Sequence, residues 1–236
     1  MAEKKAVQAQ PKQHAEQGDA WLRIEAFLKK YQKAILIAVG AVVVIVGGWY
    51  AYQNMVVEPK EAQAADAIYK AEANFAQDSL KAALSGVGTA RGFLYIINNY
   101  GGTKSGNLAK YYAGVCYLRL GDFNNAVKYL KDFSTDAKQI QMMAYGCLGD
   151  AYSELNKNDD AITYYKKAAE TFDKDEANAS EYLFRAGMKL ELMGKTKDAV
   201  DIYKQLKEKF PQSPRAMQAD KYIYRLSIEP NDFSSK

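Results

Sequence analysis

Histidine, cysteine and proline are scarce in this chain of 236 residues, which contains one histidine, two cysteines and five prolines. So few cysteines exclude a disulfide scaffold and a Cys/His zinc module, and the low proline content excludes a collagen-like chain. The only histidine, His14, lies in a polar N-terminal stretch, so no nucleophile–base pair that relies on histidine can be built. We therefore expect a non-enzymatic protein with no metal, no cofactor and no small-molecule substrate. The hydrophobic share of 48% and the charged share of 25% are those of a globular protein.

A long apolar run is the most prominent feature near the N-terminus. Residues 34–57 are 24 consecutive uncharged positions, and the first half is almost entirely Ala, Ile, Leu and Val. As a helix this run would extend roughly 36 Å, which exceeds the ~30 Å hydrocarbon core of a bilayer. Trp49, Tyr50 and Tyr52 stand near its end, as is typical of aromatic residues at a membrane interface. We predict a single transmembrane helix.

A cleaved signal peptide and a buried core helix are the competing interpretations of this run. The leader is longer than 30 residues and no Ala-x-Ala cleavage site follows the apolar core, so we predict a retained anchor. Residues 1–33 hold seven basic residues against four acidic ones, which places them in the cytoplasm and residues 58–236 across the membrane. That outer part carries 25 basic and 24 acidic residues, so it has no electrostatic surplus for binding nucleic acid.

The leader itself has two parts. Residues 1–18 are polar and are expected to be disordered. Asp19 then has the character of an N-cap for a helix that reaches the anchor. Its apolar residues recur at helical spacing, on the side of the helix opposite the basic residues. These apolar residues are Trp21, Leu22, Ile24, Phe27, Leu28 and Tyr31. This amphipathic helix either lies in the membrane interface or docks on another protein.

The outer part contains a pattern that recurs three times. Its positions are occupied by Gly114, Tyr117, Gly121, Ala126, Leu130 and Phe133, by Gly149, Tyr152, Asn156, Ala161, Tyr165 and Ala168, and by Gly187, Leu190, Gly194, Ala199, Tyr203 and Leu206. The pattern resembles the tetratricopeptide repeat, a helix-turn-helix unit of about 34 residues. Small residues would let two helices cross closely, large side chains would fill the gap beside them, and Gly or Asn would form the turn. The predicted fold is all-α, with one transmembrane helix followed by an α-solenoid of helical hairpins.

This resemblance implies a concave groove lined by the first helix of each unit. It places these residues there as candidate partner contacts: Tyr111, Val115, Arg119, Asp150, Ser153, Glu154, Glu181, Phe184, Met188 and Glu191. The equivalent positions also hold Leu108, Leu118, Met143, Gly146 and Leu192. The carboxylate clamp by which some members of the family hold chaperone C-termini needs Lys and Asn at two positions where this sequence has neither, so the resemblance does not extend to chaperone-tail binding.

The predicted organisation has five parts. They are a cytoplasmic tail with an amphipathic juxtamembrane helix at 1–33, the anchor at 34–57, a helical linker and partial repeat at 58–106, three repeats at 107–211, and a capping helix and tail at 212–236. Cys116 and Cys147 fall on consecutive first helices, where we expect packed thiols, although an oxidising compartment would allow them to pair.

The whole layout resembles the YfgM-type bacterial inner-membrane proteins. That likeness implies repeats exposed to the periplasm and protein partners such as the Sec translocon or periplasmic chaperones. The function expected from it is a protein–protein interaction scaffold that assists protein export. The alternatives are a structural organiser of cell-envelope assembly, acting in wall synthesis or outer-membrane biogenesis, and a eukaryotic organelle receptor, because the charge rule names a side and not an organism.

Overall fold

The computed structural model of the protein describes residues 12–228, with side chains at Trp21 and from Ile24 onward. The described chain divides into two units, one that ends at Glu58 and one that begins at Pro59. Disorder was expected for residues 1–18, of which residues 1–11 lie outside the described part of the chain. The described residues are mostly α-helical, as the sequence pattern predicts.

The first unit is built on one long helix, α1 (Lys12–Tyr52), which a π-helical turn, η1 (Gln53–Val57), joins to α2 (Glu58–Ala76). The expected helix start at Asp19 is wrong, because α1 begins at Lys12. Lys, Gln, Ala and Glu predominate between these two positions, and all four are good helix formers, so the helix continues through Gly18 at a cost of only about 1 kcal/mol.

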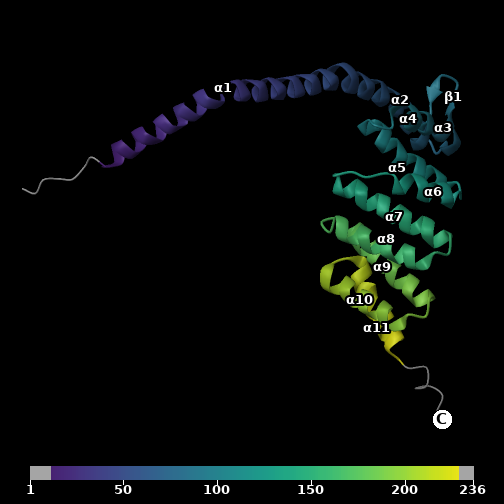
Figure 1. Cartoon of the computed structure of the whole chain (residues 1–236). Helices are drawn as coiled ribbons and strands as arrows, with labels where there is room; N and C mark the ends of the chain where they lie inside the picture. Colours follow the sequence, from purple (N-terminus) through teal and green to yellow (C-terminus); the bar gives the residue numbers. More distant parts are fainter. Residues whose placement is uncertain (1–11, 229–236) are drawn as a thin grey trace, which may run out of the picture. The chain divides into compact units, whose positions relative to one another are not determined.

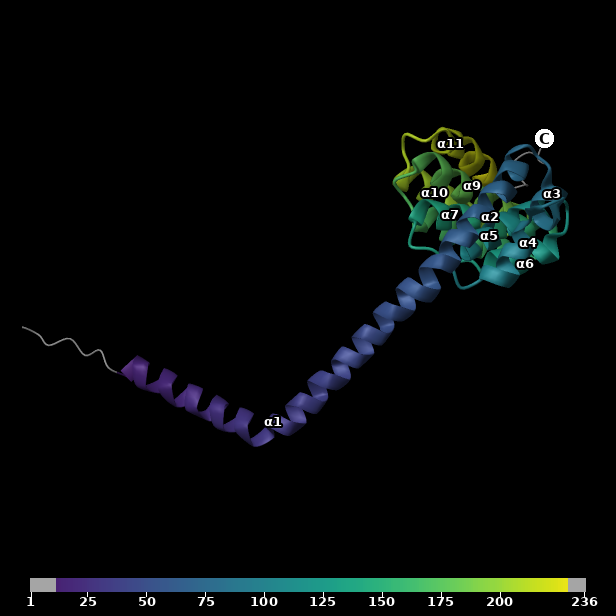
Figure 2. The ribbon, with the colours of Figure 1, turned by 90° about the horizontal axis from the view of Figure 1, so that it is seen from above.

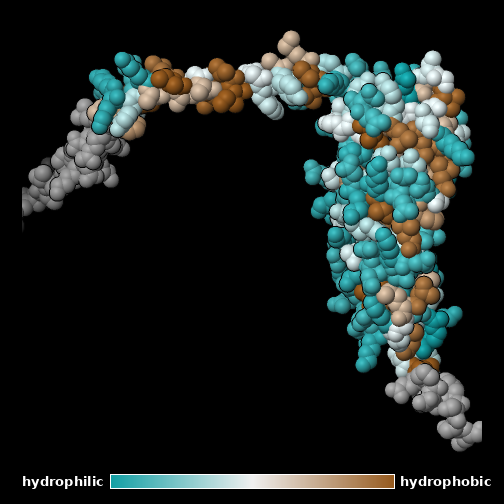
Figure 3. Space-filling model, turned by 45° about the vertical axis from the view of Figure 1, so that its right-hand side comes forward, coloured by the Kyte–Doolittle hydropathy of each residue, from teal (hydrophilic) through white to brown (hydrophobic). Residues whose placement is uncertain are grey.

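The apolar part of α1 is unpartnered. Within the helical stretch Ile24–Ala76, the most apolar window of 18 residues has a mean hydropathy of 2.3, and none of it is buried. Brown atoms cover this part of α1 in Figure 3, whereas teal atoms are frequent on the part that precedes it. The described chain therefore has one N-terminal helix that is long and apolar enough to span a membrane. Because it is not covered by protein, the interpretation as a buried core helix does not hold.

The second unit contains a stack of helical hairpins. Its helices are α5 (Lys104–Arg119), α6 (Phe123–Lys131), α7 (Lys138–Glu154), α8 (Asn158–Thr171), α9 (Glu176–Leu192), α10 (Thr196–Lys209) and α11 (Pro214–Ser227). Each helix packs on the next in chain order, and the pairs α5–α6, α7–α8 and α9–α10 follow one another down the stack, with α11 at its end (Figure 1).

The repeated small residues and turns explain why each pair of helices forms a hairpin. A Cβ placed at Gly149 would lie 2.4 Å from the ring of Tyr165, and Gly114 and Gly187 stand in the same relation to Leu130 and Tyr203. These glycines let the two helices approach closely, as the pattern predicts. Between the helices, Gly121, Asn156 and Gly194 adopt φ of 82°, 58° and 71°, the left-handed conformation that Gly and Asn tolerate best.

The segment before the hairpins packs on them. It consists of α2, α3 (Leu80–Ser85), a hairpin of two-residue strands, β1 (Gly86–Val87) and β2 (Ala90–Arg91), and α4 (Phe93–Tyr100). In the antiparallel strand pair, Gly86 lies opposite Arg91. Ile68 on α2 and Phe93 and Ile96 on α4 are buried with Cys116 of α5 in one core cluster. A second core cluster is formed by buried side chains of α6 to α11.

Two helix starts show how the ends of this stack are tied. Thr103 caps α5 by accepting from the Gly106 amide at 2.9 Å, and Ser213 caps α11 by accepting from the Ala216 amide at 3.1 Å. In addition, Glu61 of α2 accepts hydrogen bonds at the start of α5, from the Lys104 amide at 2.7 Å and the Ser105 amide at 2.9 Å. Residues 59–76 are therefore packed onto the first hairpin and do not form a free linker.

Candidate partner-binding surface

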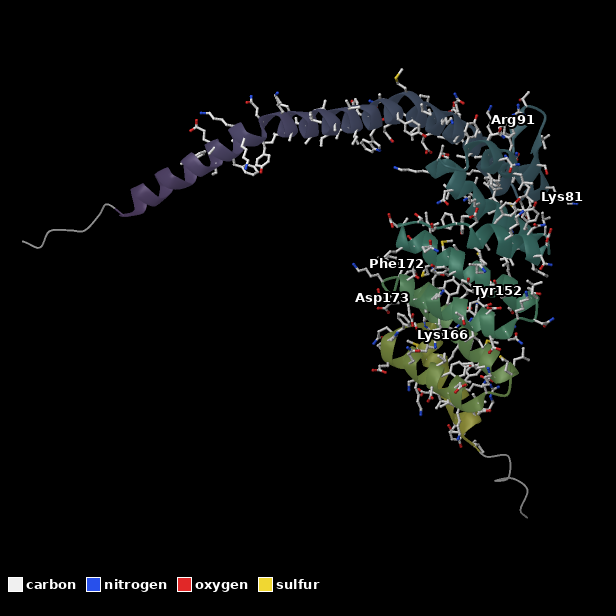
Figure 4. The ribbon with its side chains drawn as sticks, in the orientation of Figure 1. Lys81, Arg91, Tyr152, Lys166, Phe172 and Asp173 are labelled. Atoms are coloured by element: carbon white, nitrogen blue, oxygen red, sulfur yellow. The ribbon has the colours of Figure 1, made fainter. Side chains whose placement is uncertain are left out.

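The ten candidate contact residues lie on α5, α7 and α9, the first helices of the three hairpins. We call the side chains of α5, α7, α9 and α11 at these and equivalent positions the first-helix surface. Tyr152 of α7 lies near one edge of the hairpin stack, and Phe172 and Asp173, in the turn that joins α8 to α9, lie at the opposite edge (Figure 4). The first helices run between these two edges.

A chain of ion pairs crosses this surface from α7 to α11. Arg185 of α9 donates to Asp150 of α7 at 2.7 Å and to Glu181 of its own helix at 2.9 Å. Arg215 of α11 donates to the other oxygen of Glu181 at 2.5 Å. The Tyr165 hydroxyl of α8 also donates to Asp150, at 2.7 Å. The two carboxylates thus connect successive hairpins.

A second set of the same kind lies between α9 and α11. Glu191 of α9 accepts a hydrogen bond from the Tyr203 hydroxyl at 2.6 Å and is paired through its other oxygen with the guanidinium of Arg225. As in the first set, a tyrosine of the second helix and an arginine of the next first helix converge on one acid. Both oxygens of Glu191 are therefore occupied within the protein.

The protonation states of these groups follow from their neighbours. Partial burial by itself raises the pKa of Glu181, but the guanidinium groups of Arg215 and Arg185 outweigh it and hold the pKa below its usual value. Burial, and then the adjacent carboxylate of Asp150, raises the pKa of Tyr165. Burial and the carboxylate of Glu191 do the same for the pKa of Tyr203. At neutral pH Glu181 is therefore an ionised acceptor, and the hydroxyls of Tyr165 and Tyr203 are donors.

The apolar candidates divide into exposed and packed side chains. Met188 is 48% exposed, and among the equivalent positions of this surface Leu192 is 72% and Met143 is 40% exposed. Phe184 is only 2% exposed, with the Arg215 guanidinium 4.5 Å from its ring centre. A buried ring cannot contact a partner unless α11 moves, so Phe184 is a core residue and the expectation that it lines the surface is wrong.

The other candidates on α5 and α7 have mixed surroundings. Tyr111 is half-buried, with its ring centre 5.5 Å from that of Phe133. Arg119 pairs with Asp78 at 2.7 Å. Val115 and Ser153 are half-buried, and Glu154 is exposed.

Comparison with protein families identifies the hairpins. One family model of the tetratricopeptide repeat matches residues 108–137 and 181–213, and a second model of the same repeat matches residues 144–175. The chain contains tetratricopeptide repeats. No curated protein matches the chain significantly. Proteins built from tetratricopeptide repeats typically bind other proteins and are not enzymes, so the matched repeats indicate a surface for protein–protein interaction.

The arginines that hold the tetratricopeptide repeats together are the residues that sequence reasoning missed. Each lies 34 or 35 positions after its acid, as in Asp150 with Arg185, Glu181 with Arg215 and Glu191 with Arg225. That separation is close to one repeat length. Opposite charges about one repeat apart were therefore the available signal, because these side chains reach from the first helix of one repeat to the first helix that follows in the stack.

A glycine-containing string, residues 101–106, precedes the first tetratricopeptide repeat and bears a superficial likeness to a phosphate loop. The structure fills the α5 N-terminus with a carboxylate of the chain itself. Partial burial alone raises the pKa of Glu61, but hydrogen bonds from Ser105 and Lys104 outweigh it and lower the pKa. The amides that would bind an anion are thus already paired with one.

The two cysteines are free thiols, Cys116 buried and Cys147 half-buried. Burial raises the pKa of the Cys116 thiol to about 12 and, together with the charge of Asp150, that of Cys147 to about 12. They are therefore neutral packing groups in the tetratricopeptide repeats. Among the described residues, no cluster of three or more His, Cys, Asp or Glu side chains could hold a metal ion.

Proposed function

We propose that the protein is a membrane-anchored scaffold that binds other proteins on its first-helix surface. The observation that carries this proposal is the array of tetratricopeptide repeats behind a single unpartnered apolar helix. Repeats of this kind stack into an extended surface of fixed shape, which suits recognition of protein partners better than chemistry on a small molecule.

The proposed contacts are the exposed part of the first-helix surface. Met188 and Leu192, one helical turn apart on α9, offer flexible apolar contacts. Glu154 of α7 and Arg119 of α5 are exposed charged groups of the same surface, although Arg119 is also paired with Asp78. Tyr111, Val115 and Ser153 contribute half-buried side chains. The acids Asp150, Glu181 and Glu191 act mainly by fixing the shape of the surface, because each is paired with an arginine inside the protein.

The proposed site of action is the periplasmic side of a bacterial inner membrane. The support is the basic leader, with seven basic residues against four acidic ones before the apolar run, together with the resemblance of the layout to the YfgM-type proteins. Partners proposed on that basis are the Sec translocon and periplasmic chaperones. Topology reporters fused after the C-terminus of the full chain test the side. A reporter active only in the cytoplasm would reject it.

Site-specific crosslinking tests the surface and the partners together. We would place a photo-crosslinking amino acid at Met188 and, as a matched control, at Thr163, which is exposed on the second helix α8. In native membranes we expect translocon or chaperone subunits crosslinked from Met188 and not from Thr163. Equal yields from both positions would reject the first-helix surface. Partners of wall synthesis or outer-membrane assembly would support the cell-envelope alternative.

A further inference from the structure

The part of α1 that precedes the apolar run has an exposed apolar face. Its members, Trp21, Ile24, Phe27, Leu28 and Tyr31, are 42–71% exposed. At about 100° per residue they fall within an arc of about 120° on the helix. Ring centres of Phe27 and Tyr31 lie 4.8 Å apart, so aromatic rings on successive turns of this apolar strip are in contact. We call residues 21–33 the juxtamembrane arm.

The opposite side of the juxtamembrane arm is cationic. Lys29, Lys30 and Lys33 are exposed there, and Glu25 is the only acidic residue of the arm. Glu25 is paired with Lys29 at 2.7 Å. The ammonium of Lys30 lies 5.3 Å from the ring centre of Tyr31. This leaves a net positive charge beside an apolar strip, the combination that binds anionic lipid surfaces.

The juxtamembrane arm directly precedes the apolar run, which indicates that lipid covers its apolar strip. The last residue of the arm is directly followed by the run that is proposed to cross the bilayer, so the arm begins at the depth of the lipid headgroups. The helix does not stop at this junction, but α1 bends between its amphipathic and its apolar part (Figure 2). A bent helix can place the arm along the membrane surface while the apolar part crosses it.

We propose that the juxtamembrane arm lies on the bilayer, with its apolar strip in the interfacial region and its lysines on anionic headgroups. Trp21 and Tyr31 have rings that are favoured at this depth, and lysine stems are long enough to reach headgroup phosphates around the helix. The arm thereby makes attachment sensitive to lipid composition. This proposal rests on the anchor of the proposed function but is independent of what the repeats bind.

Tryptophan fluorescence tests this with the full chain in vesicles, because the protein has only two tryptophans, Trp21 and Trp49. The Trp49→Phe variant reports on the arm, and the Trp21→Phe variant reports on the end of the anchor. Each is reconstituted into phosphatidylcholine vesicles with or without 30% phosphatidylglycerol, which include phosphatidylcholine brominated on its acyl chains as the quencher. We expect Trp21 to be quenched and blue-shifted in the anionic vesicles, and much less so in the neutral ones.

Charge variants make the test specific. Each lysine near an anionic surface strengthens binding about fivefold, so joint replacement of Lys29, Lys30 and Lys33 by Gln should weaken association of the arm about 100-fold and abolish the difference between the vesicles. Replacement by Arg should preserve it. The matched control replaces Lys131, Lys166 and Lys204 of the repeats by Gln and should leave Trp21 unchanged.

Three results would overturn the proposal. Absence of Trp21 quenching while Trp49 is quenched would show that the arm leaves the bilayer and point to a protein partner. Equal quenching in both vesicles, unaffected by the Gln variant, would show that anionic headgroups are not recognised. Absence of quenching at Trp49 as well would overturn the anchor and this proposal together, which separates failure of the arm from failure of the proposed function.

Discussion

Substitution of Gly149 by Ala tests the packing that defines each hairpin. The new Cβ would lie 2.4 Å from Cδ1 and 2.5 Å from Cε1 of Tyr165, so the ring has to move by about 1 Å to reach normal contact. That ring is 3% exposed and its hydroxyl is bonded to Asp150 at 2.7 Å, so free space is lacking. The substitution therefore overpacks the α7–α8 contact.

The magnitude combines two destabilising contributions and one stabilising contribution. Overpacking a core costs about 1–3 kcal/mol, and weakening the Tyr165–Asp150 hydrogen bond, which has a charged acceptor, adds about 1 kcal/mol. The higher helix propensity of Ala returns up to about 1 kcal/mol. We expect a net loss of about 2 kcal/mol in the free energy of unfolding of residues 59–236. With a urea slope of about 2 kcal/mol per M, the midpoint falls by about 1 M.

Urea unfolding followed by far-UV circular dichroism measures this loss. Gly102→Ala is the control, because nothing lies within 4 Å of a Cβ at that position, and its effect should stay within about 0.5 kcal/mol. Introducing Gly149→Ala into a Tyr165→Ala background removes the ring that it would strike, and the substitution should then be neutral or stabilising. If it costs the same in both backgrounds, the close approach is not the reason for the glycine.

Three further outcomes are expected. Arg185→Gln should lower the free energy of unfolding by about 1–2 kcal/mol, because it leaves two carboxylates without their shared partner, and high salt should reduce the difference. Glu61→Gln should lower the free energy of unfolding by about 1 kcal/mol at pH 7, because it weakens the cap of α5. The pKa of Glu61 is lowered in the folded protein, so the difference between variant and wild type should be fully present above pH 4.5. It should vanish as the pH falls further through the folded pKa. Cys116 and Cys147 should both alkylate in denaturant without reductant and resist alkylation in the folded protein at pH 8.

The controls for these outcomes come from the same chain. Lys195→Gln removes a pair with Asp159 whose side chains are 41% and 78% exposed, so it should change stability by less than about 0.5 kcal/mol. An equal loss for Lys195 and Arg185 would contradict the role of the inter-repeat network. A Glu61→Gln difference that stays undiminished as the pH falls below 4.5 would contradict the cap. Mass added to the cysteines only after reduction would reveal a disulfide.

Several features of the fold could be predicted because they depend on local spacing. The recurring Gly114, Gly149 and Gly187 gave the close helix crossings, and Gly121 with its counterparts gave the turns, since a small side chain or a positive φ is needed wherever the pattern repeats. The beginning of α1 was misplaced for an equally local reason: Asp19 is a good N-cap, but helix formers precede it.

The candidate surface could be predicted only in part. The resemblance to the tetratricopeptide repeat placed Met188 and Phe184 on the same first-helix surface, yet one is 48% and the other 2% exposed. The difference comes from α11, whose Arg215 and Tyr222 cover the Phe184 ring. The sequence near Phe184 does not indicate how closely α11 packs against it, so the burial of residues on this surface could be determined only from the tertiary structure.

The sequence by itself determined that the chain has one bilayer-length apolar run and a threefold pattern of helical hairpins, because both depend on the order of residue types along one helix or one turn. The tertiary structure alone decided which charges remain available. From the sequence alone, Asp150, Glu181 and Glu191 are acids that a partner could bind. In the folded protein they are paired with arginines of the following first helices, and this pairing depends on how successive repeats stack.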